Sequence, residues 1–173
     1  MTIVLYLLIF QAILGGFDVL WNHEYQEKLP QQSSAALEQK IHGTRELLYA
    51  FVFFALAGFE WHGYWAILLS AILVIEMVLT AWDFIIEDQT RKLSAVERTT
   101  HLILSMNGGA YIALLVPFIW EWASKPPQLQ AIDYNNLSYL LVFFGCAVWL
   151  WGIRDLIAGM RLSSYPIFSR SYS

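Results

Sequence analysis

The chain has 173 residues, of which 58% are hydrophobic and only 14% are charged, and its formal net charge is −4. Soluble domains usually have about a quarter of their residues charged, so this composition excludes an ordinary soluble protein and favours a single multipass membrane domain over residues 1–173. The basic residues form no stripe along the chain, so nucleic acid is not an expected partner.

Two helices are predicted in the first third of the chain. An apolar run of about 20 residues is long enough to cross a bilayer, and the first such run covers residues 3–21. No basic residue precedes it, so we expect a retained helix rather than a cleaved signal peptide. Pro30 then interrupts the chain, and Ser33 or Ser34 caps a second helix over residues 35–59.

The remaining apolar runs predict three further helices. Glu60–Gly63 forms a short turn before the first of them, and Ser94 and Glu97 have the spacing of a capping box at the start of the second. Two consecutive prolines end that helix, and a polar loop follows. The three predicted helices cover residues 64–88, 95–120 and 137–160.

The basic residues predict the orientation of this all-α integral membrane protein with five transmembrane helices. Positively charged loops stay on the cytoplasmic side of a membrane, and nine of the ten basic residues fall on one side of the predicted spans. We therefore expect the N-terminus outside, the C-terminus in the cytoplasm, and a location in the plasma membrane. The nine residues are Lys28, Lys40, Arg45, Arg91, Lys92, Arg98, Arg154, Arg161 and Arg170.

Each of the first four predicted helices carries polar residues at steps of three and four, a spacing that places them on one helix face. Because successive helices run in opposite directions, most of these residues reach the cytoplasmic ends, and Glu76 lies about 10 Å deeper than Asp83. We expect helices 1–4 to form a bundle around a shared polar site. The four stripes are Gln11, Gly15, Asp18 and Asn22; Glu38, His42, Glu46 and Tyr49; Glu76, Thr80, Asp83 and Glu87; and Glu97, His101, Ser105 and Gly108.

The acids in these stripes need partners, because a buried ionised carboxylate is stable only when it is paired or binds a metal ion. Arg45, Arg98 and Arg154 are available for pairing but are fewer than the acids. Some acids near the helix ends are expected to face water above the membrane instead. These are Glu38, Glu87, Asp88 and Glu97.

Metal binding is the leading hypothesis for the site. Glutamate and histidine on facing helices are the ligands of carboxylate-bridged di-iron and di-manganese bundles, although Glu38/His42 and Glu97/His101 have one residue more between them than the usual motif. Several carboxylates with two or three imidazoles favour iron or manganese over a structural zinc site. The predicted metal ligands are His42, Glu46, Asp83, Glu87 and His101, with Glu38 and Glu97 as further ligands.

Other residues receive more open interpretations. Glu76 is predicted to act as a proton relay or deep bridging group, and Asp18 as a further ligand or an orienting group. His23 follows the first helix and is either a ligand or an exposed loop residue. Two alternatives to a metal site built from carboxylates and histidines remain: a salt-bridge network that fixes helix register, and a haem between His42 and His101.

Small and amide side chains inside the helices are expected to serve packing. Gly15–Gly16 and Gly108–Gly109 would allow two helices to approach closely, and Asn107 would form a hydrogen bond between helices.

The sequence favours a membrane-embedded, metal-dependent oxidoreductase that uses oxygen on a lipid-like or quinone-like substrate, with its site at the cytoplasmic face. Zinc held by the same residues would instead favour hydrolysis of a lipid amide or ester. Acids at mid-depth are also typical of an ion- or proton-coupled transporter, but five spans do not form an even inverted repeat. An accessory subunit of a larger membrane complex, or a homo-oligomer in contact with membrane lipids, is a further possibility.

Overall fold

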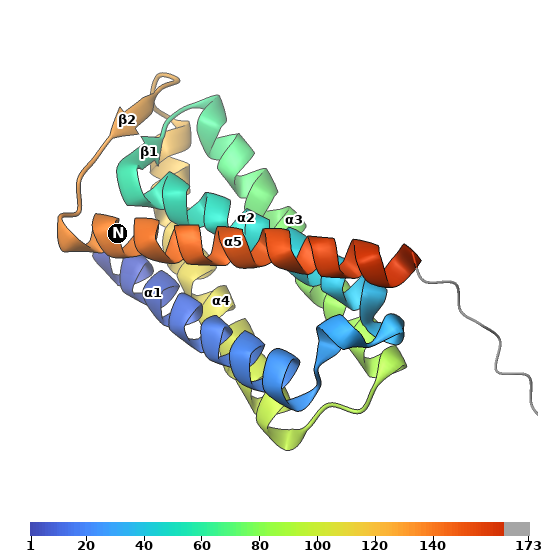
Figure 1. The fold of residues 1–173 in the computed structure, drawn as a ribbon. Coiled ribbons are helices and arrows are strands. Elements are labelled where there is room, and N and C mark those ends of the chain that lie inside the picture. Colours follow the sequence, from blue (N-terminus) through green and yellow to red (C-terminus); the bar gives the residue numbers. More distant parts are fainter. Residues whose placement is uncertain (165–173) are drawn as a thin grey trace, which may run out of the picture.

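The structure is a computed structural model that describes residues 1–164, and long helices make up most of it (Figure 1). Arg170, one of the nine basic residues used to predict the orientation, lies outside the described residues. The α-helices are α1 (Thr2–Phe17), α2 (Ala36–Gly58), α3 (Tyr64–Thr90), α4 (Ala95–Ala123) and α5 (Asn136–Ser164). Shorter elements are η1 (Asp18–Gln26), η2 (Leu29–Gln31), η3 (Ser33–Ala35), β1 (Phe59–Trp61) and β2 (Leu129–Ala131).

Four helical segments are long and apolar enough to cross a membrane, namely Thr2–Gln26, Tyr64–Thr90, Ala95–Ala123 and Asn136–Ser164. Four of the five predicted spans are thus helices with the length and apolar composition that crossing a membrane requires. The helix α2 has 23 residues, which is enough to span a bilayer. Its first half, however, carries four charged side chains, Glu38, Lys40, Arg45 and Glu46, which lower its mean hydropathy.

The helices pack side by side in the order α1–α4–α3–α2–α5, and α5 packs again on α1, so that each helix has two main neighbours. The most extensive of these interfaces joins α2 and α5, which cross one another in Figure 1. The fifth helix is therefore as much a part of the arrangement as the four that were predicted to surround the site.

Glycines allow α2 and α5 to approach closely. Gly145, Gly152 and Gly159 recur every seven residues on α5, a spacing that keeps them on one helix face. A Cβ atom added to Gly43 of α2 would lie 2.7 Å from the carbonyl oxygen of Gly152, so a larger residue at position 43 would force the backbones apart. We call this contact, formed by Gly43, Gly145, Gly152 and Gly159, the α2–α5 seam.

The ends of the bundle differ from the prediction in two places. Where a short turn was expected at Glu60–Gly63, the strand β1 pairs with β2 in antiparallel fashion, with Glu60 opposite Gln130, because the aromatic residues that flank Glu60 favour extended backbone. The first helix continues as η1 to Gln26 rather than ending at Trp21. The start of α4 is as predicted, with the Ser94 hydroxyl accepting a hydrogen bond of 3.1 Å from the Glu97 amide.

Candidate metal centre

Polar side chains from η1, α2, α3, α4, α5 and the loop after α3 gather in the interior, near the ends of α1, α3 and α5 and the starts of α2 and α4. Most of them are almost fully buried, and nearly all lie within hydrogen-bond or ion-pair distance of another member. We call this group the polar cluster. Its members are Asp18, His23, Glu38, His42, Glu46, Asp83, Glu87, Arg91, Glu97, His101 and Asp155.

The π-helical segment η1 brings three of these polar groups inward. In a π-helix the wider turn brings residues i, i+4 and i+5 near one face, and these positions here are Asp18, Asn22 and His23. The Asn22 amide donates a 2.7 Å hydrogen bond to Asp18, and His23 is only 1% exposed. The interpretation of His23 as an exposed loop residue is therefore wrong. Its role as a ligand stays a prediction.

Arg91, in the loop between α3 and α4, contacts three acids of the polar cluster. Its guanidinium donates hydrogen bonds to both Glu38 (2.8 Å) and Glu97 (2.6 Å) and lies 3.9 Å from Glu87. Burial lowers the pKa of Arg91, but its hydrogen bonds to Glu97 and Glu38 outweigh this effect and raise that pKa above its ordinary value.

Two sequence-based expectations change with this contact. Glu38, Glu87 and Glu97 were expected to face water, yet each is 0% exposed, because each lies within ion-pair distance of Arg91. Only Asp88 of the four acids is exposed. The arginine that pairs with these three acids is Arg91 and not Arg98.

Arg45 holds the deeper acids. Its Nη1 atom lies 2.5 Å from Asp83 Oδ2, and its Nε atom lies 3.5 Å from Glu76 Oε1. The Thr80 hydroxyl donates a further 2.6 Å hydrogen bond to Glu76. Glu76 is thus buried and connected through Arg45 to Asp83 and the polar cluster.

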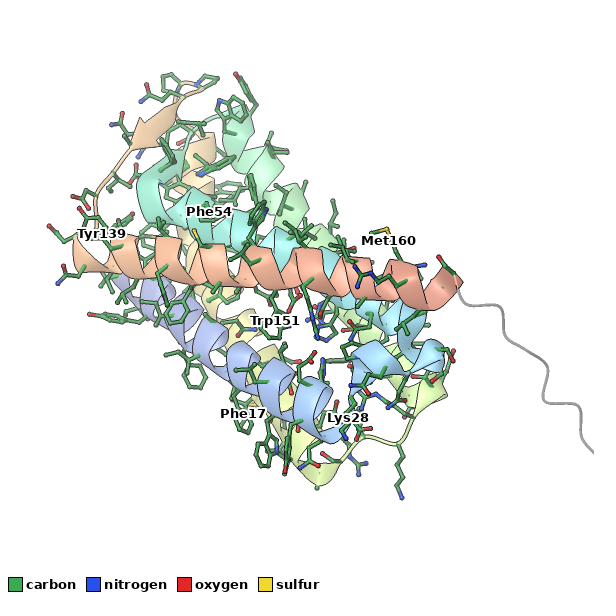
Figure 2. The ribbon with its side chains drawn as sticks, in the orientation of Figure 1. Phe17, Lys28, Phe54, Tyr139, Trp151 and Met160 are labelled. Atoms are coloured by element: carbon green, nitrogen blue, oxygen red, sulfur yellow. The ribbon has the colours of Figure 1, made fainter. Side chains whose placement is uncertain are left out.

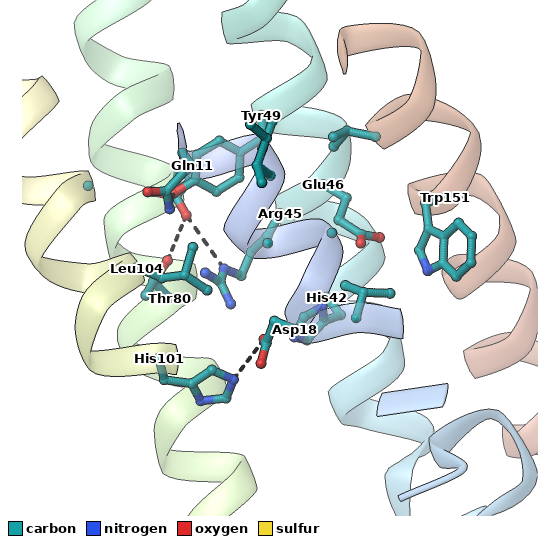
Figure 3. Close-up of a pocket in the computed structure, with 18 of the residues that line it drawn as sticks. Gln11, Asp18, His42, Arg45, Glu46, Tyr49, Thr80, His101, Leu104 and Trp151 are labelled. Atoms are coloured by element: carbon teal, nitrogen blue, oxygen red, sulfur yellow. Dashed lines mark hydrogen bonds and ion pairs between the residues drawn. The ribbon is translucent and has the colours of Figure 1, made fainter. Parts of the chain in front are cut away.

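Histidine nitrogens and carboxylate oxygens approach one another at distances typical of ligands around one ion. His101 Nε2 lies 3.0 Å from Asp18 Oδ2 (Figure 3), and His23 Nε2 lies 3.7 Å from the same oxygen. A metal ion about 2.1 Å from each donor keeps neighbouring donors about 3.0–3.4 Å apart. Similar separations occur between His101 Nδ1 and Glu87 (3.4 Å), between His42 Nε2 and Asp83 (3.4 Å), and between His23 Nε2 and Glu97 (3.5 Å).

Three groups within the polar cluster have donor atoms close enough to share an ion, each group within 4.8 Å. The first two share His23, whose ring centroid lies 4.4 Å from that of His42 and 6.1 Å from that of His101. The groups are Asp18, His23 and His101; His23, His42 and Glu87; and His42, Glu46 and Asp155.

Several histidine nitrogens and carboxylate oxygens of the polar cluster are buried and have no hydrogen-bond partner among the described residues. Both ring nitrogens of His23 and both carboxylate oxygens of Glu87 are in this state, as are one oxygen each of Glu46 and Asp83. A buried carboxylate without hydrogen bonds costs several kcal/mol. Unpaired histidine nitrogens and carboxylate oxygens, both of which bind metal ions, lie together in one buried place and favour a cation-binding site over a completed salt-bridge network.

The charges of the polar cluster and its surroundings do not balance. Seven acidic side chains of the described residues are buried: Asp18, Glu38, Glu76, Asp83, Glu87, Glu97 and Asp155. Three arginines, Arg45, Arg91 and Arg154, make ion pairs with them. Even if all three histidines of the cluster were protonated, one buried carboxylate would remain, and either a bound cation or a proton kept by a buried carboxyl group would compensate it.

A cavity of about 790 Å³ lies beside the polar cluster and is lined by residues from all five helices. Its walls are mainly apolar, and Asp18, His42, Glu46 and His101 line its polar end. Pockets of about 300–1,000 Å³ are typical of small-molecule sites. The arrangement therefore places an apolar compartment directly against the histidines.

The glycines of α1 and α4 line this cavity. A Cβ atom added to Gly15, Gly16, Gly108 or Gly109 would have no neighbour within 4 Å. The prediction that these glycines bring two helices into close contact is therefore wrong. They widen an interior space, and the glycines that bring helices together are those of the α2–α5 seam.

The structure brings all nine sequence-predicted site residues into one region, but it divides them by partner. Asp18, His42, Glu46, Glu87 and His101 belong to the three groups of donor atoms. The remaining four are held by arginines: Glu76 and Asp83 by Arg45, and Glu38 and Glu97 by Arg91. Sequence reasoning missed Asp155 as a site residue, because its adjacent Arg154 indicated a simple interfacial ion pair.

The chain matches no protein-family model, no curated protein and no solved structure. Its chemistry is therefore inferred from its own residues.

Proposed function

We propose that this chain is a multipass membrane oxidoreductase that binds iron in the polar cluster and acts on a lipid-like or quinone-like substrate. The observation that carries the proposal is the buried meeting of three histidines with an excess of carboxylates, several of them without hydrogen bonds. Cations satisfy such donors and balance such charge. A mixed carboxylate and imidazole set favours iron or manganese.

The arrangement of the donors supports two ions rather than one. Asp18 and His101, with His23, would hold one ion, and Glu46 and Asp155, with His42, would hold the other. Glu87 lies between these sets, because it is grouped with His23 of the first and His42 of the second. Its two unpaired oxygens suit a carboxylate that bridges two ions.

The arginine-paired acids would orient this centre rather than bind it directly. Asp83 lies between Arg45 and His42 Nε2, and Glu97 is held by Arg91 beside His23. Carboxylates that accept from a histidine ring fix its orientation and raise its basicity as a ligand. Close packing of the His23 ring on His42 also leaves less space for a porphyrin there, which favours ions over haem.

The location of the proposed reaction follows from the same residues. We infer that α2 is a fifth span, because its charged half faces the polar cluster and its second half is apolar. We also infer that the polar cluster faces the cytoplasm, because most of the basic residues lie on that side of the predicted spans. Bound iron would supply the centre at which dioxygen is reduced. For a quinol substrate, two quinol molecules release four electrons and four protons, and dioxygen takes up all of them to give two water molecules. Glu76, at the inner side of Arg45, is the proposed proton relay.

Metal analysis tests the proposal directly. Protein purified in detergent should contain about two iron ions per chain and show an oxo-bridge absorption. His23→Ala, His42→Ala and His101→Ala should each lose metal. Loss of a group that only orients a ligand lowers metal affinity about 10–100-fold, and each of these three substitutions should lower it further. His62→Ala is the control, since His62 is also buried but bonds to Glu60 at the other end of the bundle.

The outcomes separate the alternatives. Bound zinc in place of iron would support a hydrolase built on the same ligands. Protein without stoichiometric metal, or metal content unchanged in all three cluster variants, would refute the metal centre and leave a structural salt-bridge network.

A further inference from the structure

The cavity has a polar end and an apolar remainder, which is the shape that an amphipathic molecule needs. His42, His101 and Glu46 lie at the polar end, whereas most of the remaining lining consists of apolar side chains of α1, α3, α4 and α5, interspersed with Gln11, Tyr49, Glu76, Thr80 and Ser105. Because the polar end is also part of the proposed metal centre, a molecule bound in the cavity would have its head group beside the ions.

The cavity also reaches the lipid-facing surface of the bundle. Its lining includes Phe17 of α1, Leu20 of η1, Met77 of α3 and Phe143 of α5, which are 44–65% exposed. These residues lie in segments that are long and apolar enough to cross a membrane. A molecule dissolved in the bilayer would therefore reach the polar cluster without passing through water.

Glycines keep the wall of the cavity free on two helices. Gly15 and Gly16 on α1 and Gly108 and Gly109 on α4 all line it, and an added Cβ at any of them meets no atom within 4 Å. Side chains at these four positions would project into space that is now open. Glycine in the middle of a helix costs about 0.5–1 kcal/mol relative to alanine, so four such residues at one cavity favour a function for the space.

Two unpaired polar atoms at the edge of this space indicate what kind of head group it takes. Trp151 lines the cavity from α5, and its Nε1 atom is buried without a hydrogen-bond partner. Figure 2 places Trp151 on the part of α5 that crosses above α1, and Figure 3 shows its indole on the side of Glu46 and His42. The indole is a donor only, so it requires an acceptor. The unpaired Oε2 atom of Glu46 is an acceptor.

The cavity lining offers no free arginine to an anion. Among the described residues that line the cavity, Arg45 is the one arginine, and it is already bound to Asp83 and Glu76. A carboxylate or phosphate head group would therefore find no guanidinium to pair with. An uncharged oxygen head group needs only a hydrogen-bond donor, which Trp151 Nε1 supplies.

We propose that the cavity binds an uncharged lipophilic molecule with an oxygen head group of the quinone type. The head accepts a hydrogen bond from Trp151 Nε1 beside Glu46, and the apolar body lies against the glycines of α1 and α4. The inference rests on the proposed function, since it names the substrate class of that site and excludes the anionic lipids.

The test is equilibrium binding of a tritiated decyl-substituted benzoquinone to the purified protein in detergent, with tritiated decanoate as the anionic probe. Wild type should bind the quinone, and binding should be competed by unlabelled quinone but not by decanoate. Gly108→Leu, which fills the cavity, and Trp151→Phe, which removes the donor but keeps an aromatic ring, should each weaken quinone binding about tenfold or more. Gly58→Leu is the matched control, because Gly58 has the same open surroundings but does not line the cavity.

The results distinguish this inference from the metal centre. Metal content of Gly108→Leu and Trp151→Phe should equal that of wild type, since neither residue is a metal ligand. Absence of quinone binding, decanoate binding as tight as quinone binding, or equal affinity in wild type and both variants would overturn the inference even if iron is present. Quinone binding by protein that holds no metal would support the cavity and refute the proposed oxidoreductase.

Discussion

Two sets of glycines serve opposite purposes in this molecule. In the α2–α5 seam an added Cβ at Gly43 would lie 2.7 Å from a backbone oxygen, and one at Gly159 would lie 3.0 Å from the carbonyl oxygen of Ala36. On α1 and α4, Gly15 and Gly108 face open space. One side of the bundle is packed backbone to backbone, and the other encloses a cavity beside a buried charged cluster.

This difference shows how a small helical protein can hold a polar site within a membrane. The seam fixes α2, which supplies His42, Arg45 and Glu46, against α5, which supplies Asp155. Where glycines leave no side chains between two helices, the backbones approach closely and dispersion forces stabilise the contact. The opposite side of the bundle can then form a compartment without loss of the framework that positions the polar cluster.

The largest effect is expected at the seam. Gly43→Ala would place a methyl group 2.7–2.8 Å from Gly152 and Leu156, and overpacking of this kind destabilises by about 1–3 kcal/mol. Unfolding in mixed detergent and dodecyl sulfate micelles should show this loss. Gly58→Ala on the same helix is the control, since it meets no atom within 4 Å, and it should change the free energy of unfolding by less than about 0.5 kcal/mol. Equal effects of the two substitutions would mean that the seam is not a tight contact.

The helices and the gathering of polar residues follow from sequence patterns that are local. Apolar runs of about 20 residues indicate spans, and steps of three and four indicate which residues share a face. The Ser94 cap is a local signal of the same kind, and the structure confirms it. Such signals act within one helix, so they do not depend on which helix lies alongside.

The pairing of residues between helices could not be obtained in this way. Arg91 pairs with Glu38 across 53 residues of chain, and nothing in either local pattern distinguishes Arg91 from Arg98. The burial of His23 depends on the π-helical turn of η1, which no propensity predicts. The glycines of the α2–α5 seam and those that line the cavity differ in which residues surround them, and the sequence does not show this. The seven-residue repeat of Gly145, Gly152 and Gly159 nevertheless indicates a packing face.

A smaller effect is expected where α1 and α4 are held together beside the cavity. The Asn107 amide donates to the Leu7 carbonyl (2.9 Å) and to the Gln11 side chain (2.6 Å), which confirms its predicted role as a bond between helices. Hydrogen bonds of this kind contribute about 0.6–1.7 kcal/mol, so Asn107→Ala should lower the free energy of unfolding by about 1 kcal/mol. Ser105→Ala, whose hydroxyl bonds only within α4, should have almost no effect. A loss as large as that of Gly43→Ala would mean that this side of the bundle is no looser than the seam.

The smallest effect should also reverse in sign. Gly108→Ala adds a methyl group to the middle of α4 where no atom lies within 4 Å, so it introduces no overpacking, and alanine is favoured over glycine inside a helix by about 0.8–1.0 kcal/mol. The free energy of unfolding in the same micelles should therefore rise by up to about 1 kcal/mol, while Gly43→Ala lowers it. A fall for Gly108→Ala would mean that α1 closes on α4 in the membrane and that the cavity does not persist there. A rise would show that glycine at this position costs stability. The open space that Gly108 leaves beside the polar cluster would then explain its presence.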